Sequence, residues 1–439
     1  MSVFRKYDIR GSYPDEINGE KAKKIAKAFV EVKNLHGKTV AVGRDVRKSS
    51  PGIAEAVKEG LLEQGCDVVD IGTAATPMVY YTVVEHSLAG GAMVTASHNP
   101  AGDNGVRFCE GMGLDLTYEA GIEEMEKIYQ RSFKPRKAGE LTKKDVVPGF
   151  VDKVSSSVDL SGDFKVVLDP GNGSSALFAS EIFEKMGCKV VEINSEIDGE
   201  FPARGPDPVE NIGTVGDVVV EEDADLGIAF DGDGDRGVFV DERGQRVDND
   251  VLLALFVKHL VEEGDVVIHD VKSSRLVEDM VKKVGGEDVP FRVGMSYIKR
   301  EMIGREARIG GEYTGHFFFR ENDYYDDPYY AAARLLELMD KEDRLSLLVG
   351  DLPKYHSSPE IRLVCTNKEE VPELLKKDFS DKRIVDKDGA KIYFDDGWAL
   401  VRPSGTEDKV SIRFESETEK GLSDIRNMVM ERVERYVQD

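Results

Sequence analysis

An internal repeat constrains the fold of this chain more than any other feature of its sequence. Three segments share a short apolar run, a polar turn and a pair of serines: residues 37–50 (GKTVAVGRDVRKSS), 164–175 (FKVVLDPGNGSS) and 265–274 (DVVIHDVKSS). Each is typical of a buried strand, a turn and the start of a helix. A second strand is predicted after each helix-length stretch: residues 65–71 (GCDVVDI), 187–193 (GCKVVEI) and, more loosely, 285–291 (GGEDVPF). The repeat therefore predicts strand, helix and strand three times in succession.

Short Val- and Ile-rich runs that alternate with helices indicate parallel sheets with right-handed crossovers and helices on both faces. We therefore predict an α/β protein with mixed, mainly parallel sheets. The pattern changes after residues 351–359 (DLPKYHSSP), which are typical of a linker. The remaining elements indicate a smaller α+β domain: strands at Ile361–Cys365, Lys391–Phe394 and Val410–Phe414, and a closing helix from about Thr418 to Tyr436.

Composition excludes several classes of protein. The 439 residues carry a formal net charge of −25, and 33% of them are charged, which argues against a membrane-embedded chain and against nucleic acid as the main partner. The N-terminus, MSVFRKYDIRG, lacks the apolar core of a secretory signal. The four cysteines form no C-x-x-C pair, so we expect reduced packing residues. We expect a cytoplasmic protein, and the sequence leaves its oligomeric state open.

The strongest chemical signal is Asp231-Gly-Asp233-Gly-Asp235-Arg236, which lies between the apolar runs 226–230 and 238–240. Three carboxylates at alternate positions, separated by glycines that allow a tight turn, can converge on a hard cation such as Mg²⁺. A solvated acidic turn is the plain alternative. The dinucleotide fingerprint fits poorly because the carboxylates repel a pyrophosphate, and an EF-hand loop needs glycine where Arg236 stands.

Three further strings carry candidate functional groups. Ser97-His98-Asn99-Pro100 follows a predicted strand and either displays a nucleophile or forms a capping turn. Glu312-Tyr-Thr314-Gly-His316 offers hydrogen-bonding groups to hydroxyls, although His316 is equally consistent with a structural histidine, and Phe317–Phe319 reads as a core strand. Arg402-Pro-Ser404-Gly405-Thr406 offers a guanidinium fork and hydroxyls that suit a phosphate, with a plain turn as the alternative.

Together and in this order, these strings and Tyr7-Asp-Ile-Arg10-Gly resemble the α-D-phosphohexomutase superfamily, specifically its phosphomannomutase/phosphoglucomutase branch. The resemblance covers essentially the whole chain. It implies three related α/β domains and a smaller C-terminal α+β domain around a central cleft. The implied domains are 1–147 with the phosphoserine loop, 148–247 with the metal loop, 248–352 with the sugar loop and 353–439 with the phosphate loop.

The resemblance also assigns roles to individual residues. It implies that Ser97 is the phosphoserine and that Asp231, Asp233 and Asp235 hold Mg²⁺ together with a phosphoryl oxygen. The other implied catalytic residues are His98, Arg107, Arg236 and His316. The implied contacts to the sugar and its phosphates are Tyr7, Arg10, Lys272, Lys299, Glu312, Thr314, Arg402, Ser404, Gly405 and Thr406.

Three positions depart from the family pattern. Arg107 stands at a position where the family commonly has a lysine, and that lysine is a favoured acid/base. Because arginine cannot readily lose its proton, this change moves the proton transfer toward His316 or His98. Thr314 stands where serine is usual, which keeps the hydroxyl. Met295 replaces a histidine of some relatives, which puts the sugar preference in doubt.

The expected activity is therefore the interconversion of hexose 1-phosphate and hexose 6-phosphate, of mannose and/or glucose. It would run through a phosphoserine enzyme and a hexose 1,6-bisphosphate, which is also the activator. Phosphoglucosamine mutase is the main alternative. A metal-dependent phosphatase with Asp231 as nucleophile would release free phosphate and tolerate Ser97→Ala. A non-catalytic calcium-binding protein would bind Ca²⁺ tightly without turnover.

Overall fold

The chain packs as two compact units in the computed structural model, which describes residues 2–134, 136–405 and 408–438. Unit 1 is formed by Met1–Asp248 and Thr314–Leu348, and unit 2 by Asn249–Tyr313 and Val349–Asp439. Residues 314–348, which the sequence analysis assigned to the third domain, thus pack with unit 1. The four-domain boundaries stay a prediction.

The first sheet of unit 1 has the strand order β1-β5-β4-β2-β3-β7, with β6 beside β5. Strands β4, β2, β3 and β7 are parallel, β5 runs antiparallel to them, and β1, which is antiparallel to β5, has the same direction as β4. Its strands are β1 (Ile9–Ser12), β2 (Thr39–Arg44), β3 (Asp67–Thr73), β4 (Gly90–Val94), β5 (Asp103–Glu110), β6 (Leu114–Asp115) and β7 (Leu141–Lys143). Its helices are α1 (Gly19–Lys33), α2 (Ser50–Glu63), α3 (Thr76–Glu85) and α4 (Glu123–Ile128).

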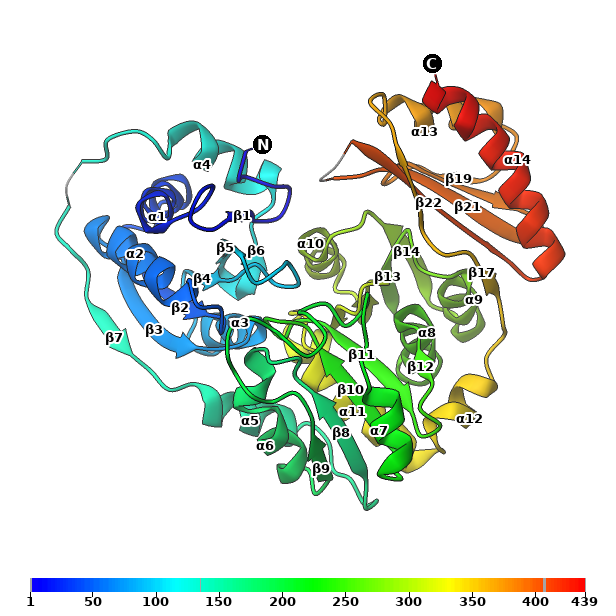
Figure 1. The fold of residues 1–439 in the computed structure, drawn as a ribbon, viewed down its shortest axis with the longest axis horizontal. Coiled ribbons are helices and arrows are strands. Elements are labelled where there is room, and N and C mark those ends of the chain that lie inside the picture. The colour runs from blue at the N-terminus through cyan, green and yellow to red at the C-terminus, as the bar shows by residue number, and fades with distance from the viewer. Residues whose placement is uncertain (1, 135, 406–407, 439) are drawn as a thin grey trace. The chain divides into compact units, whose positions relative to one another are not determined.

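Helices cover both faces of this sheet, with α1 and α2 on one side and α3 on the other (Figure 1). Gly91 of β4 makes the close packing of α3 possible, because a Cβ there would lie 2.7 Å from Val79 of α3. On the other face, a Cβ on Gly90 would be in ordinary contact with the Phe29 ring of α1 at 3.5 Å. The strand that leads to Ser97 is therefore held tightly from both sides.

The second sheet of unit 1 has the order β12-β11-β10-β8-β9, with β10, β8 and β9 parallel. Its strands are β8 (Lys165–Asp169), β9 (Lys189–Glu192), β10 (Leu226–Phe230), β11 (Gly237–Asp241) and β12 (Arg246–Val247). The remaining elements of unit 1 are α5 (Val147–Ser155), α6 (Ala179–Lys185), α7 (Val215–Glu221), the buried strand β16 (Phe317–Phe319) and α11 (Pro328–Lys341), and the chain leaves the unit within α12 (Leu345–Gly350).

An aromatic cluster fixes the end of β10 where the acidic loop begins. The ring of Tyr329 on α11 stacks on Phe230 at 4.9 Å and meets Phe178 edge-on at the same distance. Phe150 of α5 packs edge-on against Tyr329, whose hydroxyl hydrogen-bonds to Ser175 Oγ at 2.6 Å. Because Phe230 directly precedes Asp231, this cluster anchors the start of the predicted metal loop.

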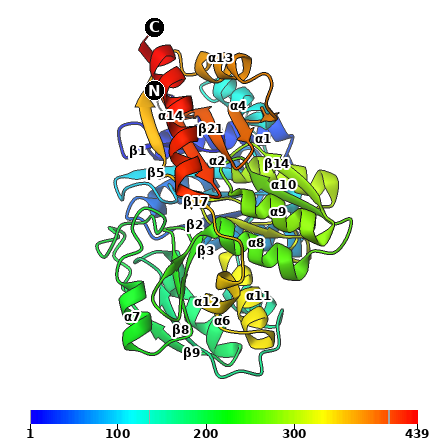
Figure 2. The ribbon, with the colours of Figure 1, turned by 90° about the vertical axis from the view of Figure 1, so that its right-hand side faces the viewer.

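Unit 2 contains a parallel group of strands, β14-β13-β15, and an antiparallel C-terminal sheet. The first group comprises β13 (Val266–Asp270), β14 (Glu287–Phe291) and β15 (Ile309–Gly311), with helices α8 (Asn249–Leu260), α9 (Arg275–Val284) and α10 (Met295–Arg305). The C-terminal part comprises β17 (His356–Ser357), β18 (Ile361–Val364), β19 (Ile384–Val385), β20 (Ala390–Phe394), β21 (Gly397–Pro403) and β22 (Lys409–Ser416), with α13 (Glu370–Asp378) and α14 (Glu419–Gln438). Helix α14 lies along β21 (Figure 2).

The structure confirms the repeat, because β2 with β3, β8 with β9, and β13 with β14 are parallel neighbours separated by helical segments. The predicted C-terminal strands and the closing helix are confirmed with small shifts of their ends. One strand was missed. The apolar run that begins at Trp398 forms β21 between β20 and β22, so Arg402 and Pro403 end a strand instead of belonging to a loop.

Among the described residues, no helix combines the length and the apolar composition that crossing a membrane requires.

A charged cluster connects α9 with the C-terminal sheet of unit 2. Glu278 of α9 is almost fully buried and accepts hydrogen bonds from Lys282 Nζ at 2.8 Å and from Arg383 Nη1. Burial alone would raise the pKa of this carboxyl, but the hydrogen bonds and charges of the two bases outweigh it and lower the pKa to about 2. Because the folded pKa of Glu278 lies below the ordinary value of 4.5, the ionised carboxylate with its two basic partners stabilises unit 2 fully above pH 4.5.

We therefore expect Glu278→Gln to lower the stability of unit 2 at pH 7 by about 2 kcal/mol, since two charged donors lose their anionic acceptor. The deficit relative to wild type should shrink as the pH falls from 4.5 toward 2. Urea midpoints at several pH values measure it. Glu373→Gln, which removes an exposed pair with Lys376, is the matched control and should have little effect. A deficit that is equal at pH 7 and pH 4 would contradict the expectation.

Candidate active site

The predicted nucleophile and the predicted metal loop meet inside unit 1. Ser97 follows β4, the loop 231–236 connects β10 to β11, and Ser97 Oγ lies 3.2 Å from Asp231 Oδ2. Both side chains are fully buried. Gly232 permits this approach, because a Cβ there would lie 2.9 Å from the carbonyl oxygen of Ser97. Ser97 itself has a φ of +51°, a left-handed conformation that costs a non-glycine residue about 1 kcal/mol.

The three aspartates of the loop converge. Oxygens of Asp231, Asp233 and Asp235 lie within 4.8 Å of one another, and all three side chains are buried. Asp231 Oδ1 accepts the backbone N–H of Asp235 at 3.0 Å, while Asp233 Oδ2 accepts the Thr76 hydroxyl at 2.7 Å. Within the described chain, Asp233 Oδ1 and Asp235 Oδ1 accept no hydrogen bond. Buried, unpartnered carboxylate oxygens grouped in this way fit a hard divalent cation.

Repulsion within this cluster is visible in its ionisation. Burial and the neighbouring carboxylates raise the pKa of Asp231 well above its usual range, and the pKa of Asp233 is raised for the same reasons. Burial acts on Asp235 as well, but Arg107, His316 and Arg236 outweigh it and lower the pKa of that carboxyl. The loop therefore needs positive charge close to its carboxylates.

Two arginines supply part of that charge. Arg107 of β5 is buried and donates from Nη1 to Asp235 Oδ2. Arg236 lies at the end of the loop, with Nε 4.0 Å from Asp231 Oδ2. Arg10 of β1 donates to the carbonyl of Ala96 at 3.1 Å, directly before Ser97. The strand β5 thus brings Arg107 to a metal-loop carboxylate, and β1 brings Arg10 to the serine loop.

Both histidines predicted to be catalytic lie in this site. His98 Nδ1 is 3.2 Å from Ser97 Oγ, and Arg236, burial and Arg10 together hold the pKa of His98 well below 6.5. His316 accepts a hydrogen bond from Arg236 Nε at 3.0 Å on Nε2, and its Nδ1 lies 2.9 Å from Asp326 Oδ2. Burial lowers the pKa of His316, but the nearby carboxylates outweigh it and raise that pKa. A second ring proton on Nε2 would remove the contact with Arg236.

Similarity to known proteins covers the regions of the chain that contain these residues. The chain matches four family models in order: phosphoglucomutase/phosphomannomutase alpha/beta/alpha domain I over residues 1–136, domain II over 148–244, domain III over 248–355 and the C-terminal domain over 360–432. It is 36% identical over 438 residues to a phosphomannomutase/phosphoglucomutase of Pseudomonas aeruginosa, covering 97% of this chain and 94% of that protein. The chain belongs to the phosphoglucomutase/phosphomannomutase family.

Two further proteins are similar to this phosphohexomutase over nearly its whole length. It is 35% identical over 449 residues to a probable phosphoglucosamine mutase of Methanopyrus kandleri, covering 98% of this chain and 97% of that protein. A solved phosphoglucomutase/phosphomannomutase family protein of Burkholderia thailandensis superposes with a TM-score of 0.93 at 32% identity, covering 99% of this chain and 97% of that one. The chain is an intramolecular phosphotransferase of the phosphohexomutase type.

The predicted sugar and phosphate residues are divided between the units. Tyr7 is half-buried before β1, and Thr314 lies two residues before His316, both in unit 1. Arg10 lies on β1, also in unit 1. The others with described positions lie in unit 2: Lys272, Lys299, Glu312, Arg402, Ser404 and Gly405. Thr406 lies outside the described residues.

Unit 2 connects several of these residues through one aspartate. Asp388 Oδ2 accepts Arg402 Nε at 2.9 Å and the backbone N–H of Val293 at 3.3 Å. The next amide, that of Gly294, donates to Glu312 Oε1 at 2.6 Å. Arg402 and Glu312 are thus held in one network.

The other predicted bases of unit 2 are placed separately. Lys272 pairs with Glu360 at 2.7 Å, and Lys299 is fully buried on α10. Gly405 is exposed and Ser404 half-buried at the end of β21.

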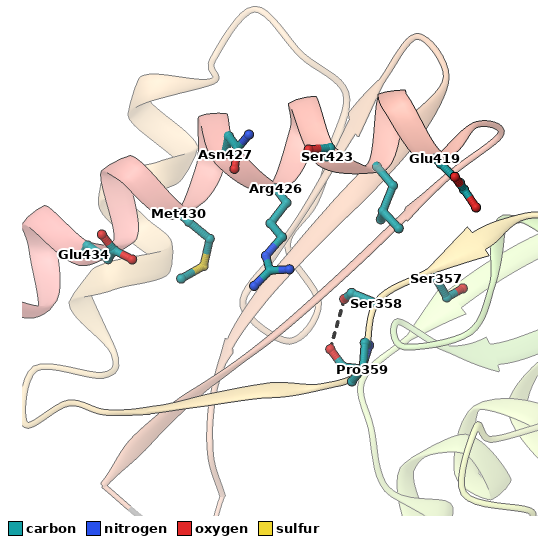
Figure 3. A pocket seen from close by; sticks show the side chains of 10 residues that line it. Ser357, Ser358, Pro359, Glu419, Ser423, Arg426, Asn427, Met430 and Glu434 are labelled. Carbon is teal, nitrogen blue, oxygen red and sulfur yellow. Dashed lines mark hydrogen bonds between the residues drawn. The ribbon is translucent and has the colours of Figure 1, made fainter.

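A pocket of about 430 Å³ in unit 2 contains none of the predicted site residues (Figure 3). Arg426 extends from α14 toward Ser358 and Pro359 in this pocket, while Glu419 and Glu434 lie along the same helix (Figure 3). The negative charges of these two carboxylates oppose binding of an anion in the pocket. The loop that begins at Arg402 therefore stays the predicted phosphate-binding loop.

Sequence reasoning missed Thr76 and Asp326. Neither follows a motif: Thr76 begins α3 and reaches Asp233, and Asp326 follows β16 and reaches His316. No local signal marks them, because each acts on a residue that is distant in the chain.

The Thr76 hydroxyl orients Asp233, so its loss should weaken metal binding. We expect Thr76→Val to reduce the affinity for Mg²⁺ about tenfold, the usual effect of removing a hydrogen bond to a metal ligand. Calorimetric titration of the purified protein measures it. Thr82→Val is the matched control, because Thr82 is buried on the same helix and donates only to the Met78 carbonyl. Equal Mg²⁺ affinity in the two variants would show that Thr76 does not shape the site.

Proposed function

We propose that this phosphohexomutase interconverts hexose 1-phosphate and hexose 6-phosphate, of mannose, glucose or both, with Ser97 as the phosphoryl carrier. Hexose 1,6-bisphosphate is then both the intermediate and the activator that loads the serine. The observation that carries the proposal is the 3.2 Å contact between Ser97 Oγ and Asp231 Oδ2. A hydroxyl buried against such a cluster can be phosphorylated only where positive groups neutralise the added charge.

Each transfer exchanges one P–O bond for another. A hydroxyl of the bound sugar monophosphate attacks the phosphorus on Ser97, its proton passes to a base, and the bond between phosphorus and Ser97 Oγ breaks. Ser97 takes up a proton as it leaves, and the product is the bisphosphate. After the sugar has turned around, the reverse exchange returns the other phosphate to Ser97. Arg236, Arg10 and Arg107 are the cations that balance the charge of these steps.

Mg²⁺ fits the aspartate cluster, with Asp231, Asp233, Asp235 and a phosphoryl oxygen on Ser97 as ligands, and it would supply charge neutralisation at the transferring group. The two unpartnered carboxylate oxygens support this assignment. Asp235 is shared with Arg107, so Arg107 also holds one ligand in place.

His98 is our choice for the proton exchange at Ser97. Arg107 cannot serve as a base, because a guanidinium stays protonated and this one is bonded to Asp235. Both ring nitrogens of His316 are engaged, by Arg236 and Asp326. His98 Nδ1 faces Ser97 Oγ at 3.2 Å, within reach of the proton that the serine gains and loses. His316 then acts through Arg236.

We further propose that the residues of unit 2 bind the sugar and the phosphate that is not reacting. Glu312, with Thr314 of unit 1, would take the sugar hydroxyls. Arg402 and the loop that contains Ser404, Gly405 and Thr406 would bind the distal phosphate, with Lys272 and Lys299 as further cations. We expect the enzyme to work in the cytoplasm.

Phosphoglucosamine mutase is the alternative activity. The 35% identity to the probable phosphoglucosamine mutase of Methanopyrus kandleri nearly equals that to the Pseudomonas aeruginosa enzyme, so overall similarity does not separate the two. The two activities share the phosphoserine and differ in the sugar. Coupled assays with mannose, glucose and glucosamine 1-phosphates distinguish them.

Freshly purified protein should carry one phosphate, and peptide mapping by mass spectrometry should locate it on Ser97. Ser97→Ala should lose both this phosphate and mutase turnover by at least ~10³-fold, because the hydroxyl that contacts Asp231 is then absent. Ser49→Ala is the control, since the Ser49 hydroxyl accepts a hydrogen bond from the Asn104 amide. Full turnover in Ser97→Ala, or free phosphate released in place of the isomeric sugar phosphate, would refute the mechanism.

Substitution of His98 tests the proposed proton exchange. His98→Gln should lower kcat by at least about 100-fold, while phosphate remains detectable on Ser97. Steady-state and single-turnover rates measure the loss. The exposed His86, whose Nε2 lies 2.7 Å from Lys144 Nζ, provides the control variant His86→Gln. Wild-type rates in His98→Gln would assign the proton exchange to another group.

A further inference from the structure

The three repeats place an aspartate at the same point of the fold. Asp45 directly follows β2, Asp169 ends β8 and Asp270 ends β13, and all three side chains are fully buried. Each of these strands lies parallel to a strand that leads into a predicted site loop. The neighbours are β4 before Ser97, β10 before Asp231 and β15 before Glu312. Because parallel strands end at the same edge of a sheet, each aspartate starts beside one functional loop.

In the first repeat, the aspartate reaches the loop through an arginine. Asp45 Oδ2 accepts Arg47 Nε at 3.0 Å, and the Arg47 side chain is fully buried. Arg47 Nη2 donates to the carbonyl oxygens of Ser97 at 2.7 Å and Asn99 at 2.6 Å. Nη1 donates to two further carbonyls of the same loop, at residues 100 and 103. One guanidinium therefore holds four carbonyls of the loop that carries Ser97.

The second repeat has the same arrangement with an arginine from another position in the chain. Asp169 Oδ2 accepts Arg204 Nε at 2.8 Å, and Arg204 is also buried. Arg204 Nη2 donates to the carbonyl oxygen of Phe230 at 2.6 Å, directly before Asp231. Arg47 lies two residues after its aspartate and Arg204 lies 35 residues after its own. The two arginines occupy similar places without being equivalent in the repeat.

In the third repeat, the aspartate contacts the loop directly. Asp270 Oδ2 accepts the backbone N–H of Tyr313 at 3.3 Å, next to Glu312, and Oδ1 accepts the N–H of Ser273 at 2.8 Å. All three carboxylates thus connect the end of one strand to the loop after its neighbour.

We propose that Asp45–Arg47 and Asp169–Arg204 are positioning residues that hold the serine loop and the metal loop in register. The left-handed backbone of Ser97 would relax unless its own carbonyl were fixed, and Arg47 donates to that carbonyl. Arg204 fixes the carbonyl at which the metal loop begins. Planar guanidinium groups suit this task because their N–H groups have a fixed geometry that a lysine does not reproduce. The inference rests on the roles proposed above for Ser97 and Asp231.

The test uses Arg47→Lys and Arg204→Lys in the full-length enzyme, because lysine keeps the charge and loses the fork. Asp45→Asn is a milder variant that keeps the arginine and removes its anchor. Lys58→Gln is the control: Lys58 and Asp70 form a buried ion pair in unit 1 that touches neither loop. The measurements are hydrogen exchange resolved by peptide, Mg²⁺ affinity, the single-turnover rate of phosphoryl transfer from Ser97 to a hexose 1-phosphate, and Tm.

Arg47→Lys and Asp45→Asn should accelerate exchange in the peptide that contains residues 97–103 and slow phosphoryl transfer at least ~10-fold, with the Mg²⁺ affinity of the dephosphorylated enzyme unchanged. Arg204→Lys should accelerate exchange around residues 230–236 and weaken Mg²⁺ binding about tenfold. Lys58→Gln should lower Tm alone.

Arginine variants that behave like Lys58→Gln would overturn the proposal, as would local loosening of the serine loop with an unchanged transfer rate. Failure of the proposed function would appear differently. Wild-type enzyme would then lack phosphate on Ser97 and lack turnover, and exchange and Mg²⁺ affinity would still decide whether the arginines hold the two loops.

Discussion

The active site is organised around mutual repulsion among three buried carboxylates. Asp231, Asp233 and Asp235 lie within one loop, out of contact with solvent, where like charges destabilise one another strongly. Neighbouring elements supply two of the compensating groups, Arg107 from β5 and the Thr76 hydroxyl from α3, and Arg236 at the loop's own end supplies a third. The strands and helices of unit 1 therefore determine where these groups meet, and the loop alone would not retain three ionised side chains.

The sequence predicted the fold in proportion to the strength of local patterns. Apolar runs such as 166–168 and 226–230 predict buried strands. The three copies of the strand, turn and helix segment predict the parallel units from the sequence alone. The strand that contains Trp398 was missed because its short apolar run continues directly into the polar string at Arg402, which by itself is typical of a loop. The division of residues 249–348 between two units depends on long-range packing and leaves no local signal.

The site was predictable where chemistry is concentrated in a short string and was not where it comes from distant residues. The acidic loop and Ser97 stand out in the sequence, and their meeting at 3.2 Å follows from the resemblance, not from any local pattern. Asp326 and Arg204 are single residues in unremarkable surroundings. Asp45, Asp169 and Asp270 are a different case, since each stands at the end of the predicted strand in its copy of the repeated segment. Comparing the copies position by position would have identified them.

The backbone at position 97 favours serine over threonine as the proposed phosphoryl carrier. Threonine offers the same hydroxyl and is phosphorylated as readily in chemical terms, but a β-branched side chain strongly disfavours a positive φ, and this residue sits at +51°. The loop thus favours the proposed nucleophile by conformation as well as by reactivity. Among the residues that carry an aliphatic alcohol, serine has the unbranched side chain that a left-handed backbone tolerates better.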